Sequence, residues 1–124
     1  TPTRDFSYII DTVDGIYTIL KSEIGFGEIY NLGSNFEISI EQTVRTIAEV
    51  LGREFNIISD ENRIRPANSE VERLWSDNSK AMNTFNWKPK YASIEGFREG
   101  IKLTSDWFSN HANLSKYKSE IYNI

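Results

Sequence analysis

The sequence predicts an α/β fold with a small sheet of about three short strands and four or so helices. Three short segments rich in aromatic and β-branched residues alternate with segments whose apolar residues recur at helical spacing. Strands and helices that alternate along a chain are typical of the α/β class. The chain has 124 residues, a length that suits one domain. We therefore treat residues 1–124 as a single domain.

The first strand is expected at Phe6–Ile10, and a helix is expected to follow over about residues 11–22. The strand segment is aromatic and β-branched and is too short for a helix. Asp11 is the expected N-cap of the helix, with Asp14 three residues later. One side of this helix is apolar, and it carries Val13, Ile16, Tyr17 and Leu20.

The second and third strands are expected at residues 28–34 and 54–59. The second, EIYNLGS, ends in a glycine turn, and the third is EFNIIS. Residues 60–73 are polar and irregular and contain Pro66, so we expect a loop there.

The clearest helix signal follows the second strand. Ser39 and Gln42 have the spacing of a capping box. Gly52 stands where a helix terminator is expected. Between them, apolar residues recur at the spacing of one helix face, at Ile40, Val44, Ile47, Ala48 and Leu51.

Two further helices are expected in the last third of the chain. Residues 76–87 predict a short helix that is capped near Asp77, and Pro89 forms part of the turn after it. Ser93 is the expected cap of a long helix. Residues 110–124 have weaker periodicity and are expected to form a helical or frayed tail.

The composition and charge of the chain exclude several classes of function. The net charge is −4 with both signs interspersed, which argues against a nucleic-acid surface. The chain has no cysteine, which excludes disulfides and thiolate metal sites, and no carboxylate cluster has metal-ligand spacing. No apolar run approaches the roughly 20 residues that span a membrane. The single histidine, His111, is expected at the surface, and we expect a cytoplasmic protein.

Tyr17 and Lys21 have the spacing of the catalytic pair of short-chain dehydrogenases. Tyr17 also continues the apolar stripe of its helix. The glycines of GFGEIYNLG precede a strand and do not lie between a strand and a helix, as a dinucleotide fingerprint requires. We therefore expect Tyr17 to be a packing residue.

Two arginines and an asparagine are the candidate ligand-binding residues. Arg4 precedes the first strand, Asn31 ends the second, and Arg65 stands before Pro66. A guanidinium matches phosphate oxygens two at a time, and a carboxamide adds a neutral donor, so the set would suit a diphosphate. The alternative is that Arg4 pairs with Asp5 or Asp11 at the surface.

Three ordered blocks resemble the extended short-chain dehydrogenases that act on nucleotide sugars. The blocks are RDFSYIIDTVDGI, EIYNLGSNFEISIEQTVRTIAEVLG, and the stretch from RPANSEVERLWSDNSKA to SDWF, and they cover about residues 3–108. The third block is most similar to bacterial UDP-N-acetylglucosamine 4,6-dehydratases. The resemblance implies that the chain is the C-terminal, substrate-binding portion of such an enzyme, without its Rossmann domain.

The resemblance also implies roles for individual residues. Arg4 and Arg65 would contact the diphosphate of the substrate, and Asn31 would contact a phosphate. Related epimerases carry Arg-Pro-Gly-Asp, whose acid meets a ribose hydroxyl. This chain has a longer stretch without that Gly-Asp, and Glu70 is the residue that would take the role.

The resemblance places the cofactor and the catalytic pair outside this chain. The full-length enzyme would bind NAD on its N-terminal Rossmann domain, and this chain alone would hold no cofactor and no catalytic residue. Thr1 stands almost directly before the first expected strand, so we expect the chain to be part of a longer protein. The helix over residues 11–22 would then pack on the Rossmann domain. Without that domain its exposed apolar side predicts self-association.

Two other hypotheses remain open on the sequence alone. The chain could be a non-enzymatic module that binds nucleotide sugars or another protein. It could also be a small structural α/β domain whose arginines only make surface pairs. The identity of the nucleotide and the sugar, and the choice between dehydration and epimerisation, are left open.

Overall fold

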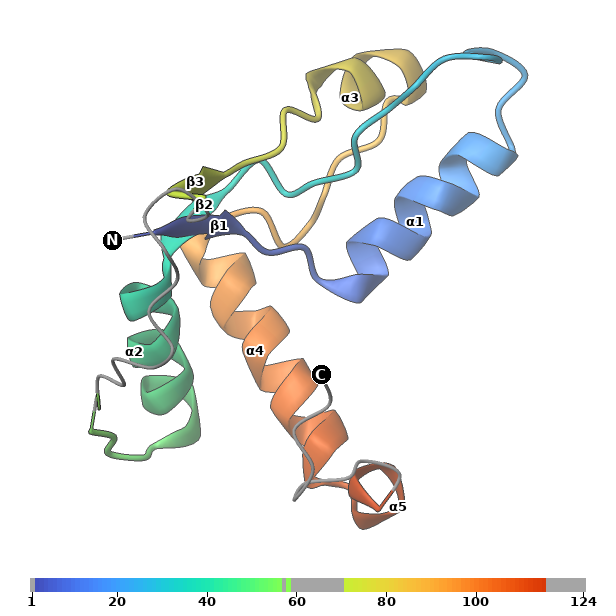
Figure 1. Ribbon diagram of the computed structural model, residues 1–124. Coiled ribbons are helices and arrows are strands. Elements are labelled where there is room, and N and C mark those ends of the chain that lie inside the picture. Colours follow the sequence, from blue (N-terminus) through green and yellow to red (C-terminus); the bar gives the residue numbers. More distant parts are fainter. Residues whose placement is uncertain (1, 57, 59–70, 116–124) are drawn as a thin grey trace.

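The computed structural model describes residues 2–56, 58 and 71–115 (Figure 1). A three-stranded sheet lies where the helices meet, with β1 (Thr3–Asp5) between β2 (Glu37–Ser39) and β3 (Arg73–Leu74). β1 pairs antiparallel with β2 and parallel with β3. Arg4 is the middle residue of the sheet, opposite Ile38 on one side and Leu74 on the other.

Five helices extend from this sheet in the described residues. They are α1 (Ile9–Leu20), α2 (Ile40–Leu51), α3 (Ser79–Phe85), α4 (Ile94–Ser109) and α5 (His111–Leu114). α2 packs against α4, and α5 continues from the end of α4. In Figure 1, α1 and α3 extend from the sheet in a different direction from α2 and α4. The α/β class with about three short strands is confirmed.

The prediction of a first strand at Phe6–Ile10 was wrong. The strand is Thr3–Asp5, and α1 already begins at Ile9. The aromatic residues that suggested a strand pack on the region of α4. The Phe6 ring centroid lies 5.8 Å from that of Phe97. The Tyr8 centroid lies 4.7 Å from that of Tyr91. Tertiary packing explains the apolar pattern here.

The other two strand predictions were also wrong where the structure describes the residues. Residues 28–34 belong to no strand, although exposed Ile29 and Asn31 alternate with half-buried Tyr30 and Leu32 as in a strand. A strand needs a neighbour, and no main-chain partner lies beside residues 28–32 in the described part of the chain. Residues 54–56 and 58 are not strand either, and the third strand is Arg73–Leu74, which was expected to be loop.

The prediction for α2 is confirmed in detail. Ser39 Oγ accepts a hydrogen bond from Gln42 N at 3.1 Å, and Gln42 Oε1 accepts one from Ser39 N at 3.2 Å. Gly52 ends the helix with a φ of 60°, in the left-handed region that glycine adopts without strain.

Asp11 has a different role from the one expected. Tyr8 is the N-cap of α1, and Asp11 lies inside the first turn, where it is 5% exposed. Its two carboxylate oxygens accept from Lys90 N and Tyr91 N, each at 2.8 Å. Asp11 therefore joins α1 to the chain that leads into α4.

The expected helix starts near residues 77 and 93 are largely confirmed. Ser93 Oγ accepts from Gly96 N at the start of α4. Asp77 Oδ1 accepts from Ser79 N, although the N-cap residue of α3 is Asn78. Residues 111–114 of the expected tail form α5, whereas residues 116–124 of that tail and residues 60–70 of the expected loop lie outside the described part.

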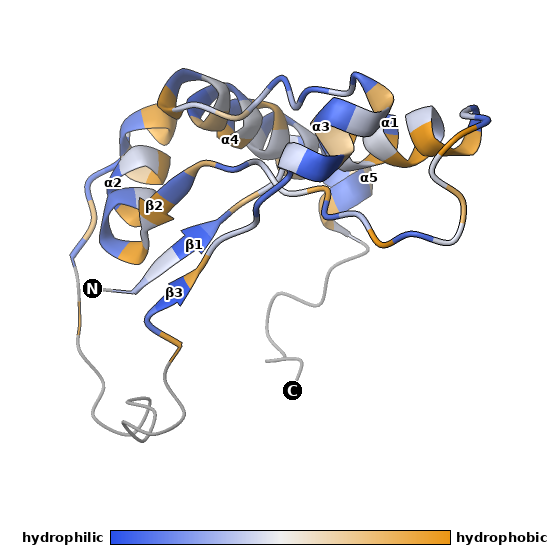
Figure 2. Ribbon diagram, turned by 90° about the horizontal axis from the view of Figure 1, so that it is seen from above, coloured by the Kyte–Doolittle hydropathy of each residue, from blue (hydrophilic) through white to orange (hydrophobic). Residues whose placement is uncertain are grey.

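The buried core is small, and one helix face is left uncovered. Among the described residues, the buried apolar ones are Ile38, Ala48, Ala81, Trp87 and Phe97. The stripe of α1 that was expected to be exposed is exposed, from 49% for Ile16 to 77% for Leu20. Figure 2 shows hydrophobic colouring along α1 and into the chain that follows it. Large uncovered apolar patches of this kind mark sites of contact with another surface.

No helix in the described ranges is both long and apolar enough to span a membrane. The same ranges contain no cluster of three or more histidine or acidic side chains arranged to hold a metal ion.

The role of Asp11 predicts a large loss of stability in Asp11→Ala. The change leaves the amides of Lys90 and Tyr91 without their acceptor, and each lost charge-assisted bond is worth about 1.5–3 kcal/mol. We expect urea unfolding to show a loss of about 3 kcal/mol. Asp14→Ala, at an exposed position of the same helix, is the control and should change stability by less than about 0.5 kcal/mol. Equal losses in both variants would contradict this role.

Candidate functional site

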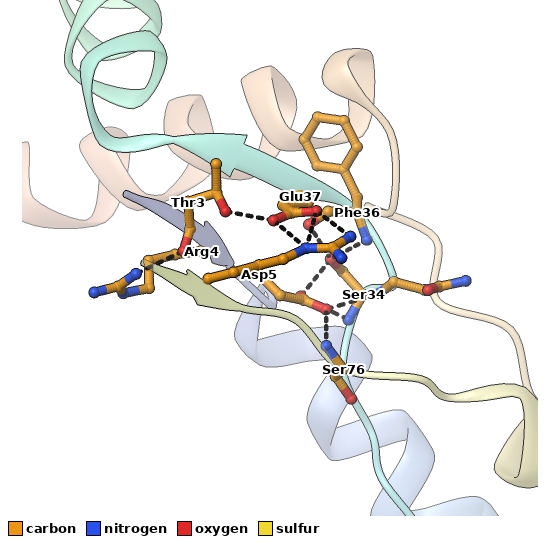
Figure 3. A network of polar contacts seen from close by, with 9 residues as sticks. Thr3, Arg4, Asp5, Ser34, Phe36, Glu37 and Ser76 are labelled. Carbon is orange, nitrogen blue, oxygen red and sulfur yellow. Dashed lines mark hydrogen bonds and ion pairs between the residues drawn. The ribbon is translucent and has the colours of Figure 1, made fainter. Parts of the chain in front are cut away.

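The carboxylate of Asp5, at the end of β1, joins three segments of the chain (Figure 3). Its Oδ1 accepts from Ser34 N at 3.0 Å and from Ser34 Oγ at 2.6 Å. Its Oδ2 accepts from Asn35 N at 3.0 Å and from Ser76 N at 3.2 Å. β1, the turn before β2 and the chain after β3 are therefore held at one point.

A hollow of about 290 Å³ opens beside this junction. It is lined by Asp5, Ser7, Asn31, Gly33, Leu74, Trp75 and Ser76. Gly33 allows the two walls to approach, because a Cβ at this position would overlap the Ser76 side chain. The hollow is the candidate ligand site because a predicted ligand residue, Asn31, lies in its wall.

Asn31 is exposed in this wall, and its side chain is oriented by the chain opposite. Asn31 Nδ2 donates to Asp77 O at 3.3 Å. That bond is long and exposed, so a stronger acceptor could take over the same N–H group.

Arg4 lies at the sheet beside the hollow but is not part of its lining. Arg4 Nη1 donates to Thr3 O at 2.7 Å and to Val71 O at 2.8 Å. In Figure 3 the Arg4 side chain points away from Asp5, Ser34 and Ser76, as expected for neighbouring residues of a strand. Its contact with Val71 brings it to the chain that directly follows Glu70.

The other two predicted site residues, Arg65 and Glu70, lie outside the described residues. The structure thus brings Asn31 to the hollow and places the Arg4 side chain on the opposite face of β1. Whether all four residues converge stays a prediction.

A second polar cluster lies on the same face of the sheet as Asp5, because Glu37 is the cross-strand neighbour of Asp5 and Arg73 is that of Thr3. Glu37 on β2 accepts a bidentate pair from Arg73 on β3, with Arg73 Nε and Nη2 each 2.7 Å from a carboxylate oxygen. Thr3 Oγ1 also donates to Glu37. The hydrogen bonds from Arg73, and then that from Thr3, lower the pKa of Glu37 below its usual value. The Arg73 guanidinium carbon lies 4.8 Å from the ring centroid of Trp75, in the wall of the hollow.

The Tyr17 and Lys21 pair does not have a catalytic arrangement. Lys21 Nζ lies 4.5 Å from the centroid of the Tyr17 ring, so the cation contacts the ring face. Tyr17 is 54% exposed on the uncovered side of α1.

Apart from Asn31, sequence reasoning missed the residues that line or support the hollow. Asp5 was considered only as a surface partner of Arg4, and the interactions of Ser34, Glu37, Arg73 and Ser76 were not anticipated. The contacts of Asp5 cross 29 to 71 residues of sequence. The only local signal was a carboxylate next to Arg4 in a block that resembles a family motif.

Comparisons with known proteins agree with this fold and these blocks. The family described as GDP-mannose 4,6 dehydratase matches residues 1–101. Human dTDP-D-glucose 4,6-dehydratase is 34% identical over 124 aligned residues, which cover 92% of this chain and 33% of the human protein. The bovine protein of the same description is 34% identical over 112 residues, covering 86% of this chain and 29% of that protein.

Solved structures show the same correspondence. The NAD complex of dTDP-glucose 4,6-dehydratase from Bacillus anthracis matches with a TM-score of 0.66 and 26% identity, over 89% of this chain and 32% of that one. UDP-glucuronic acid 4-epimerase from Bacillus cereus matches in fold, with a TM-score of 0.70 and 24% identity, over 88% of this chain and 32% of that one. This chain spans about a third of the length of these relatives.

The hydrogen bonds to Asp5 predict that the segments around the hollow become more mobile in Asp5→Ala. Without the carboxylate, the amides of Ser34, Asn35 and Ser76 lose their acceptor. We expect their hydrogen exchange to accelerate by at least about tenfold, since one lost bond corresponds to roughly 1.4 kcal/mol or more. Asp106→Ala, an exposed position of α4, is the control. Unchanged exchange at all three amides would contradict the role of Asp5.

The Arg73 and Glu37 pair predicts a pH effect. Because the pKa of Glu37 is lowered in the folded state, its contribution to stability is present above the unfolded pKa and is lost as pH falls through the folded value. Arg73→Gln should raise the pKa of Glu37 toward its ordinary value, measured by NMR titration of the side-chain carboxyl. Arg45→Gln, which breaks an exposed pair within α2, should leave that pKa unchanged. A Glu37 titration that is the same in both variants would refute the assignment.

Proposed function

Because this chain belongs to the family of GDP-mannose 4,6-dehydratase and related extended short-chain dehydrogenases of nucleotide sugars, we propose that it is the nucleotide-sugar-binding part of an NAD-dependent 4,6-dehydratase or epimerase. Its task is to grip the diphosphate of the substrate. The chemistry belongs to the whole enzyme, because this chain spans a third of its relatives and holds neither a dinucleotide fingerprint nor a catalytically arranged pair in the described residues.

One observation carries this proposal. The three blocks that resemble the family meet at the hollow: Asp5 comes from the first block, Asn31 and Gly33 from the second, and Trp75 and Ser76 from the third. A site assembled from separate segments and fixed by a sheet is the arrangement expected for a ligand that must be held in one orientation.

The proposed ligand contacts follow from the chemistry of a diphosphate. Asn31 presents an amide donor in the wall of the hollow. Arg4 lies on β1 with its side chain on the face away from Asp5, where its guanidinium donates to Val71 O, and Arg65 precedes Val71 in the sequence. The carboxamide of Asn31 and the guanidinium of Arg65 would neutralise and orient the phosphates at the hollow, and Arg4 would join them only if its side chain reorients from the other face of β1. Glu70 would accept from a ribose hydroxyl.

The uncovered side of α1 fits a position against the cofactor-binding part of the whole enzyme. About two thirds of the length of the relatives lies outside the part that this chain matches, and the Bacillus anthracis dehydratase is a complex with NAD. We propose that α1 packs on that remaining part, that NAD is bound there, and that the intact protein works in the cytoplasm. UDP-N-acetylglucosamine is the first substrate to test, and the choice between dehydration and epimerisation awaits product analysis.

The direct test is an NMR titration of the ¹⁵N-labelled chain with uridine diphosphate and with uridine. Binding through the diphosphate predicts shifts at the amides of Asn31, Gly33 and Ser76 with the diphosphate and not with the nucleoside. We expect weak affinity, because one side of the cleft belongs to the part of the enzyme that this chain does not span. No shift near the hollow at any concentration, or equal shifts with uridine, would refute the proposed grip. Tight binding by the chain alone would favour an independent sensor module.

A charge-removing variant tests the diphosphate contact. Arg65→Gln should weaken binding of uridine diphosphate about tenfold to a hundredfold, because a charge-assisted hydrogen bond is worth roughly 1.5–3 kcal/mol. Arg98→Gln removes an arginine that pairs with Glu49 between α4 and α2, and it should leave the affinity unchanged. The dissociation constants come from the same NMR titration. A loss that is equal in the two variants would show a general effect of net charge.

The apolar side of α1 predicts concentration-dependent self-association of this chain. Sedimentation velocity should show species larger than 14.3 kDa as concentration rises. Ile16→Lys places a charge in the centre of the exposed stripe and should restore the monomer, whereas Lys102→Glu on α4 should not. A monomer of the unmodified chain at high concentration would contradict the prediction.

A further inference from the structure

Two carboxamide side chains connect the segment that carries Asn31 to the chain before α3. Asn31 Nδ2 donates to Asp77 O at 3.3 Å, and Asn78 Nδ2 donates to Gly33 O at 2.8 Å. The two bonds run in opposite directions between residues 31–33 and 77–78. This wall of the hollow is therefore attached near both ends, and the bond from Asn78 is the shorter.

Asn78 is deeply buried and has one unpaired atom. The residue is 1% exposed, and its Oδ1 has no donor within the described part of the chain. The cost of a buried acceptor without a partner is comparable to, or larger than, the net gain from one hydrogen bond. An apolar side chain of similar volume would avoid that cost, but it would leave Gly33 O without this donor. The distinctive contribution of Asn78 is its donation to Gly33.

Asn78 does not line the hollow itself. It lines a second cavity of about 170 Å³, together with Ser34, Asn35, Met82, Lys88, Pro89 and Ala92. Gly33 and Asn31 line the hollow described above, between β1 and the chain after β3. The Asn78 side chain can thus influence a ligand in the hollow only through the main chain at Gly33, to which it is bonded.

We propose that Asn78 is a positioning residue for the nucleotide diphosphate, an inference that rests on the proposed function. Asn78 holds Gly33, and Gly33 fixes the place of Asn31 two residues earlier. When a phosphate oxygen takes over Asn31 Nδ2 from Asp77 O, the wall loses its weaker attachment. The bond from Asn78 then keeps the wall in place, so that binding does not have to order it again.

The test compares Asn78→Leu with Asn113→Leu. Asn113 is a matched control because its Nδ2 also donates to a main-chain carbonyl, that of Trp107, far from the hollow. In Asn78→Leu we expect the affinity for uridine diphosphate to fall about tenfold at a temperature where the variant is folded. The shift of the Asn31 side-chain amide on titration should shrink in parallel. Asn113→Leu should match the unmodified chain in both measurements.

A ligand-free measurement separates this inference from the proposed function. The ¹⁵N relaxation of the Asn31 side-chain amide should show faster internal motion in Asn78→Leu and no change in Asn113→Leu, whether or not uridine diphosphate binds. If Asn78→Leu does not fold, Asn78→Ser, whose hydroxyl is too short to replace the amide, serves in the same comparison. Lower thermal stability with unchanged affinity and unchanged Asn31 motion would show a purely structural role and would overturn the proposal. If the unmodified chain does not bind uridine diphosphate, but Asn31 motion changes as expected in Asn78→Leu, only the proposed function is refuted.

Discussion

The architecture around the hollow depends on one carboxylate at the end of a three-residue strand. Asp5 accepts hydrogen bonds from Ser34, Asn35 and Ser76, and these residues belong to the two segments that flank β1. The strands themselves have only two or three residues each, so their ladders contribute few hydrogen bonds. A charged acceptor that serves several donors at once makes up for short ladders, because charge-assisted bonds are stronger than neutral ones. The bidentate pair of Glu37 and Arg73 does the same across the outer strands.

The same constraint brings two walls of the hollow close together. Gly33 and Ser76 are drawn so close by Asp5 that no Cβ fits at position 33. Asn31, two residues before Gly33, is thereby placed at the rim, and Asn78 supports the wall from the buried side. Segments that hydrogen bonds already hold in place can present donors to an anion with little loss of conformational entropy on binding. That property suits a part whose proposed task is to orient a substrate for chemistry carried out elsewhere in the whole enzyme.

The sequence predicted the helices better than the strands, for a physical reason. A capping box and a glycine terminator are complete within one segment, and α2 follows both of them. A strand is defined by its neighbour. Residues 28–34 have the alternation of a strand but no partner in the described part of the chain, whereas Arg73–Leu74, in a polar stretch, pairs with β1. Phe6 and Tyr8 gave a strand-like pattern because they contact aromatic rings near α4. The local pattern of apolar residues does not distinguish a strand that has a partner from a segment that only resembles one.

By itself, the sequence determined the α/β class, the family blocks, the limits of α2, the start of α4, the exposed apolar side of α1 and the identity of Asn31 as a candidate ligand residue. Tertiary structure alone decided which carboxylates are structural. Asp5 and Asp11 bind main-chain amides between 29 and 80 residues away, and nothing in their immediate sequence specifies those partners. It also decided that Asn31 faces a hollow while the Arg4 side chain lies on the other side of β1. Propensities and caps act within a few residues, whereas a site is formed by contacts between segments that only the folded chain brings together.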